Sequence, residues 1–165
     1  VGLESSGSWA SEPSNYPNGC HVCEVEVDPE TGRVEIDRYV VVDDVGTVIN
    51  ELTLKGQVHG GIAQGVGQAL WEHVVYDRAS GQMLSASFMD YAMPRASGLP
   101  SYTAEFIEIP TPSHPLGIRP AGEGGTTGAL AAVANAVLDA LSDYDVDHID
   151  MPLTSEKVWR AINGR

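Results

Sequence analysis

The sequence is poor in basic residues and has no long apolar run. Its 165 residues include 23 Asp and Glu but only 9 Lys and Arg, which gives a net charge of -14. Nucleic acids and anionic membranes both attract basic surfaces, so no nucleic-acid partner is expected. No apolar run approaches the roughly 20 residues of a membrane-spanning helix, and no basic-then-apolar signal segment precedes Trp9. The sequence predicts a soluble protein with no membrane span.

Cysteine is scarce, with only Cys20 and Cys23 present. The stretch HVCEVEVD alternates apolar and polar residues as a half-buried strand does, and strand residues three apart face opposite sides of a sheet. The two thiols could not converge on one metal, and no second CxxC exists to complete a zinc site. We therefore interpret both as strand-packing cysteines and expect no metal ligand among the side chains.

The signatures of several enzyme classes are also missing. The chain has no GxxxxGK[ST] phosphate loop, no GxGxxG after a strand, no GxSxG of serine hydrolases and no HExxH of zinc proteases. Its histidines are scattered without the spacing of metal ligands, at His21, His59, His73, His114 and His148. A free nucleotide-binding module is thus disfavoured, and each histidine alone is better explained by packing or surface exposure.

The order of the remaining signals predicts an α+β domain with β-hairpins and a mixed sheet packed against helices. Strands are expected at residues 21–27 and 33–43, joined by the turn DPETG, and again at 84–94 and 102–109. Helices are expected at 54–76, at 128–141 after a Thr126 or Thr127 cap, and at 154–162 after a Thr154 or Ser155 cap.

The first residues differ in composition from the rest. Residues 1–18 are rich in Ser, Gly, Pro and Asn, with Trp9 and Tyr16 as the large side chains. We interpret residues 1–18 as a linker and residues 19–165 as the domain, so the chain is expected to be a piece of a longer protein.

The predicted helix at 54–76 contains five glycines, Gly56, Gly60, Gly61, Gly65 and Gly67. Each interior glycine costs about 0.5–1 kcal/mol relative to alanine. What glycine offers in return is close approach, so the helix should pack tightly against another element or against a large ligand. Composition leaves these two readings even.

The stretch GIRPAGEGGTTGA places Glu123 among glycines, after a loop with several prolines and before a helix. A carboxylate there can simply complement the helix dipole. It can also be a general base, because a rigid loop holds the side chain in place and the glycines admit a substrate or cofactor. The residues alone leave both interpretations open.

Several motifs resemble one known family. They are NGCHVCEVEVDPETGRVEIDRYVVVDDVGTVIN, GQVHGGIAQGVGQALWEHVVYD, FMDYAMPRA, GIRPAGEGGTTGA and HIDMPLTSEKVWRAI. In this order they resemble the C-terminal part of the molybdopterin-binding large subunit of the xanthine oxidase family, the molybdenum hydroxylases. Within it they are most similar to the large chains of aerobic carbon monoxide dehydrogenases and their homologues. The resemblance spans about residues 17–162.

The resemblance implies roles for particular residues. Glu123 matches the family's general base beside molybdenum. Gln57 matches a glutamine that hydrogen-bonds the pterin, and Arg119, Ala121 and Gly122 match residues whose backbone contacts the cofactor. Pro120 stands where many relatives have glycine, and a proline removes one backbone donor. The implied cofactor is molybdopterin with molybdenum, in its cytosine dinucleotide form.

The resemblance also implies partners. The N-terminal part of the molybdenum-binding subunit would supply the other cofactor contacts and the pocket for a small-molecule substrate. Iron–sulfur clusters and FAD would lie on other domains or subunits, and the location would be cytoplasmic. The implied activity is oxidation or hydroxylation of a carbon centre with oxygen from water. The rival hypothesis is a non-catalytic remnant or assembly domain that completes the fold of a partner chain.

Overall fold

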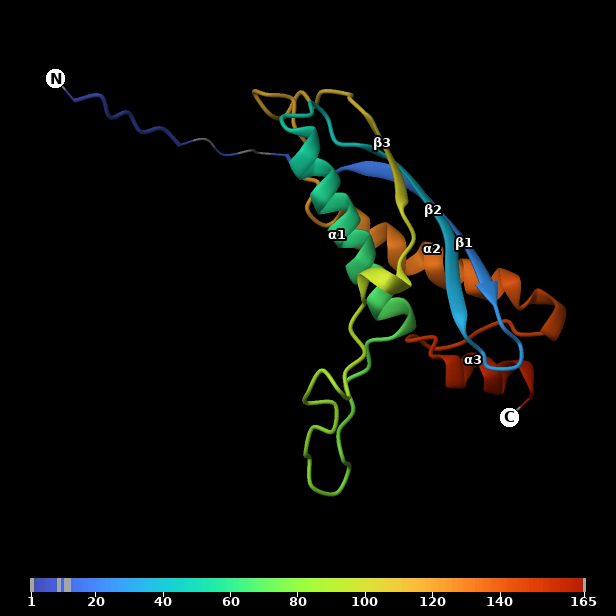
Figure 1. Cartoon of the computed structure of the whole chain (residues 1–165). Helices are drawn as coiled ribbons and strands as arrows, with labels where there is room; N and C mark the ends of the chain where they lie inside the picture. The colour runs from blue at the N-terminus through green and yellow to red at the C-terminus, as the bar shows by residue number, and fades with distance from the viewer. Residues whose placement is uncertain (1, 9, 11–12, 165) are drawn as a thin grey trace.

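The structure, a computed structural model, describes residues 2–8, 10 and 13–164. A three-stranded sheet, ordered β1 (Asn18–Val27), β2 (Val34–Asp44) and β3 (Tyr102–Ile107), packs against helices (Figure 1). β1 runs antiparallel and β3 parallel to β2, so the sheet is mixed. The helices are α1 (Glu51–Leu70), α2 (Gly124–Ala140) and α3 (Ser155–Ile162), with short 3-10 turns at Ala96–Gly98 and Ser142–Tyr144. The predicted α+β class is confirmed.

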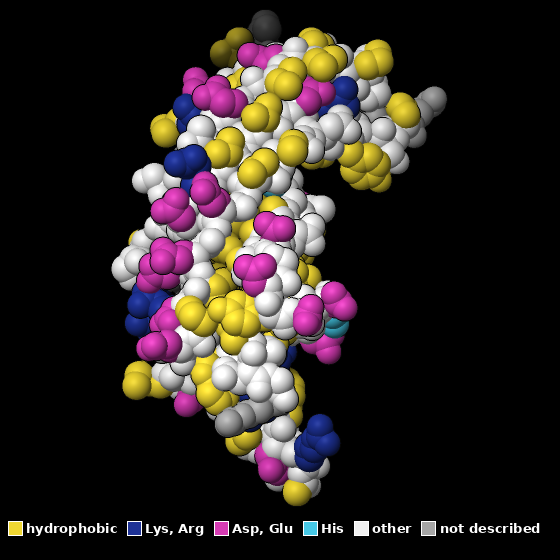
Figure 2. Space-filling model, turned by 90° about the vertical axis from the view of Figure 1, so that its right-hand side faces the viewer, with side chains coloured by type: hydrophobic (Ala, Val, Ile, Leu, Met, Phe, Trp, Pro, Cys, Tyr) yellow, Lys and Arg dark blue, Asp and Glu magenta, His cyan; other side chains and the backbone are white. Residues whose placement is uncertain are grey.

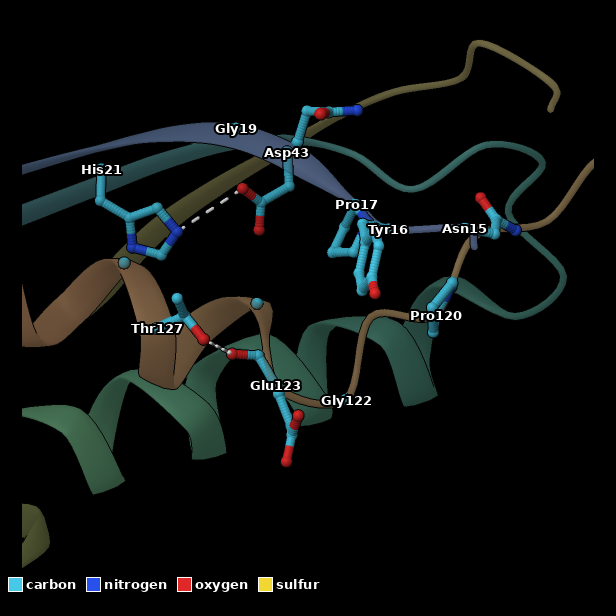
Figure 3. A pocket seen from close by; sticks show the side chains of 13 residues that line it. Asn15, Tyr16, Pro17, Gly19, His21, Asp43, Pro120, Gly122, Glu123 and Thr127 are labelled. Carbon is cyan, nitrogen blue, oxygen red and sulfur yellow. Dashed lines mark hydrogen bonds and ion pairs between the residues drawn. The ribbon is translucent and has the colours of Figure 1, made fainter. Parts of the chain in front are cut away.

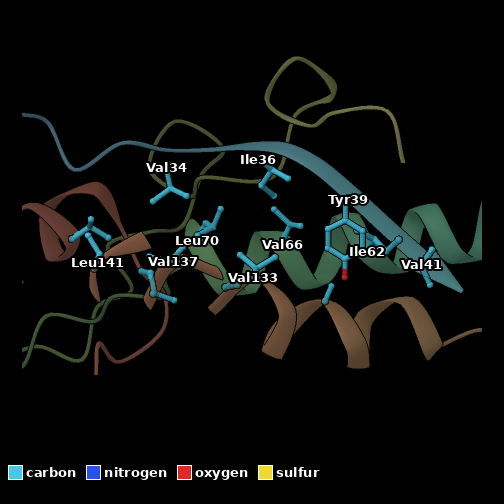
Figure 4. Packing of buried hydrophobic residues seen from close by; sticks show 14 of the residues in the cluster. Val34, Ile36, Tyr39, Val41, Ile62, Val66, Leu70, Val133, Val137 and Leu141 are labelled. Carbon is cyan, nitrogen blue, oxygen red and sulfur yellow. The ribbon is translucent and has the colours of Figure 1, made fainter. Parts of the chain in front are cut away.

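The core lies between β2 and the two long helices (Figure 4). Valine and isoleucine side chains of β2 face α1 and α2, and Tyr39 of β2 is fully buried among them. The buried members of this core include Val34, Ile36, Tyr39, Val41, Val58, Ile62, Val66, Leu70, Val133, Val137 and Leu141. This burial fixes the crossing of α1 and α2 against the sheet.

The hairpin of β1 and β2 forms as predicted. The Asp28 N–H donates to the Arg33 carbonyl at 2.9 Å, and Gly32 adopts a φ of +70°, which glycine tolerates best. A Cβ at Gly32 would collide with the Ser155 carbonyl, so the turn sits directly on the start of α3. The Thr154 side chain accepts from the Lys157 N–H and caps that helix, as expected.

The bounds of α1 differ from the prediction of 54–76. The helix begins at Glu51 because the Asn50 side chain accepts a hydrogen bond from the Thr53 N–H at 3.0 Å. It ends at Leu70, and His73 is exposed beyond it. Asn50 followed by Glu51 was a readable start signal. At the end, the N–H groups of Trp71 and Glu72 both donate to the Gly67 carbonyl, and Pro94 packs where a Cβ on Gly67 would lie.

The strand predicted at 84–94 is wrong. Residues 72–95 form an arm that projects from the end of α1 (Figure 1). Within it the Asp77 N–H donates to the Gln82 carbonyl at 2.8 Å, and a single bridge joins Tyr76 to Met83. These contacts form a turn, but the apolar run after it has no neighbouring strand to pair with among the described residues.

Burial alternates along the two outer strands of the sheet. Along β3, Tyr102, Ala104 and Phe106 are partly buried, whereas Thr103, Glu105 and Ile107 are exposed. β1 shows the same alternation, which leaves Cys20 exposed and Cys23 packed against the core. The two thiols lie on opposite faces as predicted, but only Cys23 is a packing cysteine.

Cys23 should resist alkylation in the native protein. Burial raises the pKa of its thiol to about 11, so at pH 8 the thiolate fraction is on the order of a hundredfold lower than for a free cysteine. Labelling of Cys23 by iodoacetamide should be slow, rise about tenfold per pH unit, and become fast in denaturant. Mass spectrometry of the labelled peptides gives the rates; equal native and denatured rates at pH 8 would contradict this assignment.

The surface reflects the composition. Figure 2 shows acidic side chains spread over one face with few Lys and Arg among them. No helix in the described part of the chain is long and apolar enough to cross a membrane. Of the two large side chains expected near the start, Trp9 lies outside the described residues and Tyr16 is 68% exposed. The proposed division at residue 18 stays a prediction.

Candidate functional site

Glu123 occupies the N-cap position of α2. Its backbone lies near φ -113° and ψ -3°, and its side chain makes no capping hydrogen bond. The helix starts at Gly124, so the predicted caps are wrong: the Thr127 hydroxyl donates instead to the Glu123 carbonyl at 3.0 Å. The Glu123 carboxylate is exposed, and in Figure 3 it points away from the neighbouring strands. It is therefore free to act on a group outside this chain.

The start of α2 is fixed by contact with α1. A Cβ on Gly125 would collide with the Val58 carbonyl, and one on Gly65 would lie 2.6 Å from the Ala129 Cβ. The Thr126 hydroxyl lies 3.0 Å from the Gly61 carbonyl oxygen. Close packing of the two helices thus explains Gly61 and Gly65. The sequence predicted a packing partner for this helix but did not identify it as α2.

Two glycines of α1 have no such explanation. Gly56 and Gly60 are exposed, and a Cβ on either would meet nothing within 4 Å. They lie four residues apart and so share one face of the helix. Gln57 is exposed beside them and makes no hydrogen bond within the described part of the chain. Gly122, before Glu123, is equally open.

The predicted contacts around Arg119 are only partly available. The Arg119 N–H already donates to the Val45 carbonyl at 2.9 Å. Its side chain pairs with Asp44, with 3.3 Å between Nε and Oδ2, and its Nη1 donates to the Tyr16 carbonyl at 3.2 Å. In contrast, the N–H groups of Ala121 and Gly122 have no partner among the described residues. Those two amides are therefore free donors of this loop.

Asp44 anchors this arrangement. Burial, the largest single cause, would raise the pKa of its carboxyl, whereas hydrogen bonds from the N–H groups of Gly46 and Ile109, at 3.0 and 3.1 Å, lower it. The Arg119 guanidinium adds to them, so the pKa of Asp44 is lowered overall. The charged pair fixes the loop that leads to Glu123.

A pocket of about 710 Å³ lies beside this loop (Figure 3). One side is formed by residues 15–19 with His21 and Asp43, and the other by Pro120, Gly122, Glu123, Gly124, Thr127 and Gly128. Gln57, Arg119 and Ala121 do not line it. The fold thus brings Gly122 and Glu123 to one pocket, while Gln57 lies on α1 next to Val58, which abuts Gly125.

Sequence reasoning missed the polar group at the far end of this pocket. The hairpin register pairs His21 with Val41, so His21 lies diagonally between Tyr39 and Asp43 on one face. His21 Nδ1 lies 2.7 Å from the Tyr39 hydroxyl, and Nε2 lies 3.5 Å from Asp43 Oδ1. The DPETG turn alone would not have found them, because the register shifts by one residue at a β-bulge between Glu24 and Val25 before the strand reaches His21.

Comparison with known proteins assigns the family. A model described as a molybdopterin cofactor-binding domain matches residues 1–100. The nicotine 6-hydroxylase large subunit of Paenarthrobacter nicotinovorans is 39% identical over 163 residues, which are 99% of this chain and 20% of that protein. The chain belongs to the molybdopterin cofactor-binding domain family. The carbon monoxide dehydrogenase large chain of Hydrogenophaga pseudoflava is 34% identical over 98% of this chain and 20% of that protein.

The fold of this molybdopterin-binding chain matches solved relatives. Quinoline 2-oxidoreductase from Pseudomonas putida 86 superposes with a TM-score of 0.86 at 39% identity, over 90% of this chain and 19% of that chain. The resemblance read from the sequence motifs is thus confirmed, and the relatives are oxidoreductases. This chain spans about a fifth of their length.

The residues present fit a bound molybdopterin. A large ligand needs open backbone and unpaired donors, and this chain offers exposed glycines at Gly56, Gly60 and Gly122 with the free amides of Ala121 and Gly122. Among the described residues no cluster of three or more His, Cys, Asp or Glu could hold a metal ion.

Proposed function

We propose that this chain is the C-terminal cofactor-binding part of a molybdenum hydroxylase, with Glu123 as its general base. The complete protein would oxidise or hydroxylate a carbon centre of a small molecule with oxygen derived from water. The observation that carries this proposal is the Glu123 carboxylate, which stands at a helix N-cap without a capping bond and is exposed beside open glycines. A carboxylate that makes no structural hydrogen bond is available to accept a proton.

The cofactor would lie along the exposed face formed by α1 and the loop before α2. The Gln57 amide would donate to it or accept from it, the N–H groups of Ala121 and Gly122 would donate to it, and Arg119 would hold the loop. When bound, molybdopterin with molybdenum supplies the two-electron oxidation. This chain's residues bind and orient the group, and Glu123 holds the proton removed during the reaction. We propose the cytosine dinucleotide form of the cofactor.

The partners follow from the length of the relatives and from the arm. The arm exposes large apolar side chains, with Leu84, Phe88 and Met89 at 53%, 76% and 93% exposure. A group of exposed apolar side chains is typical of a surface that packs against another part of a protein. We propose that the arm packs on the N-terminal part of the same large subunit, which the other four-fifths of the relatives represents. Iron–sulfur and flavin components on other domains or subunits would carry electrons away, in the cytoplasm.

Gln57→Leu in the complete enzyme should lower bound molybdenum by roughly tenfold under dilution, because a polar contact to the cofactor is lost without loss of side-chain bulk. Gln68→Leu is the matched control, since Gln68 is an equally exposed glutamine of α1 that this proposal leaves without a role. Metal content after gel filtration is the measurement. Equal retention in both variants would remove Gln57 from the site.

Purification separates this function from the non-catalytic alternative. A chain isolated from its source with molybdenum and the remaining part of the large subunit supports the enzyme. A metal-free monomer supports an assembly domain or remnant.

A further inference from the structure

The His21 side chain belongs to a buried polar unit with no role so far. The side chains of His21 and Asp43 are 7% and 6% exposed, and Tyr39 is 0% exposed. Burial, the largest cause, raises the pKa of Tyr39 well above its usual value, so its hydroxyl stays protonated. That hydroxyl can donate to His21 Nδ1, which leaves the Nε2–H of the ring to face Asp43.

This unit rests directly on the first turns of α2. A Cβ on Gly128 would lie 2.6 Å from atoms of the His21 ring, so the ring sits on the helix backbone. Asp43 Oδ2 lies 3.7 Å from where a Cβ on Gly124, the first residue of α2, would be. The Asp43 carboxylate in turn covers Gly19, where any side chain would collide with it. Because Gly19, Gly124 and Gly128 carry no side chain, there is room for His21 and Asp43 between the sheet and α2.

The negative charge near the start of α2 therefore comes from a side chain of the sheet and not from the N-cap residue. A helix N-terminus favours a nearby negative charge, and an N-cap carboxylate normally provides it. Here Glu123 makes no such bond, and the Asp43 carboxylate of β2 lies beside the first turn instead. Figure 3 shows Asp43 turned toward His21 and the helix, with the Glu123 carboxylate directed to the other side.

We propose that His21 and Asp43 are a positioning pair that holds the first turn of α2 and so fixes the direction of the Glu123 carboxylate. Tyr39 sets the orientation of the His21 ring. The pair supplies the negative charge that an N-cap side chain would otherwise supply at the helix start. Glu123 is therefore left available as a base. The inference rests on the proposed function of Glu123, and neither His21 nor Asp43 is given contact with substrate or cofactor.

Asp43→Asn in the complete enzyme tests the pair. The variant keeps the shape and removes the charge at the helix start. We expect kcat to fall on the order of tenfold with KM changed less than about threefold, because misplacement of a base affects the chemical step more than binding. Amide hydrogen exchange in the peptide covering residues 123–128 should rise about fivefold. Asp37→Asn, an exposed carboxylate on the same strand, should change neither.

The exchange rate and the kinetics together decide the outcome. Faster exchange with unchanged kcat would show a purely structural pair and overturn the inference, as would no change in either. If Asp43→Asn does not fold, Tyr39→Phe keeps the buried ring, and we expect the same pattern at about threefold; unchanged exchange and kcat in Tyr39→Phe would then overturn the inference. Turnover retained by Glu123→Gln would defeat the proposed function instead, and it leaves the exchange result intact.

Discussion

Glu123→Gln in the complete enzyme is expected to lower kcat by roughly 10²- to 10⁴-fold, the range over which general bases contribute. Glutamine has the size of glutamate but cannot accept the proton. Because Glu123 makes no capping bond and is exposed, its loss should cost the fold little. Steady-state kinetics and molybdenum analysis on the same preparation give the two quantities needed.

The controls for this substitution are metal content and a second glutamate. Molybdenum content should stay near that of the unmodified enzyme, since the glutamine side chain leaves the backbone N–H groups of Ala121 and Gly122 in place. Glu26→Gln, an exposed position on β1, should leave kcat unchanged. Turnover within tenfold of normal for Glu123→Gln would refute its role as base, whereas loss of molybdenum would make Glu123 a binding residue.

Gly125→Ala is expected to destabilise the chain by about 3 kcal/mol, at the upper end for added bulk in a packed interface. The new Cβ would meet the Val58 carbonyl and lie 2.9 Å from the Ile62 nitrogen, both in the backbone of α1, so no side chain can turn aside. The helices would have to separate and expose the core between them. Chemical denaturation followed by circular dichroism measures the loss.

The matched control lies on the neighbouring helix. Gly56→Ala adds the same methyl group to α1 where nothing lies within 4 Å, and should stabilise by about 0.5–1 kcal/mol through helix propensity. Opposite signs for the two variants are the diagnostic result. A similar loss from both would mean that glycine is needed along α1 for a reason other than its crossing with α2.

The packing reading of the glycine-rich helix is correct for part of it, and the ligand reading stays a prediction. Gly61 and Gly65 allow close packing, and the element packed against them is α2. Gly56 and Gly60 serve nothing within the described part of the chain and suit the ligand interpretation. Composition could count these glycines without sorting them, because the sorting depends on which side of α1 the second helix lies.

The candidate site divides in the same way. Glu123 and Gln57 were found through motifs, and the structure leaves both exposed. The Arg119 amide was expected to be a donor and is occupied by Val45. His21 and Asp43 escaped notice because their meeting depends on strand register.

The sequence by itself determined the elements with local causes. The DPETG turn specified the hairpin, and Thr154 capped α3, because these signals act over a few residues. The five motifs in their order carried the resemblance to the family. Tertiary structure alone decided the start of α2 and the absence of a strand at 84–94. Each of these depends on whether a partner far along the chain packs or pairs there, and local propensity carries no information about that partner.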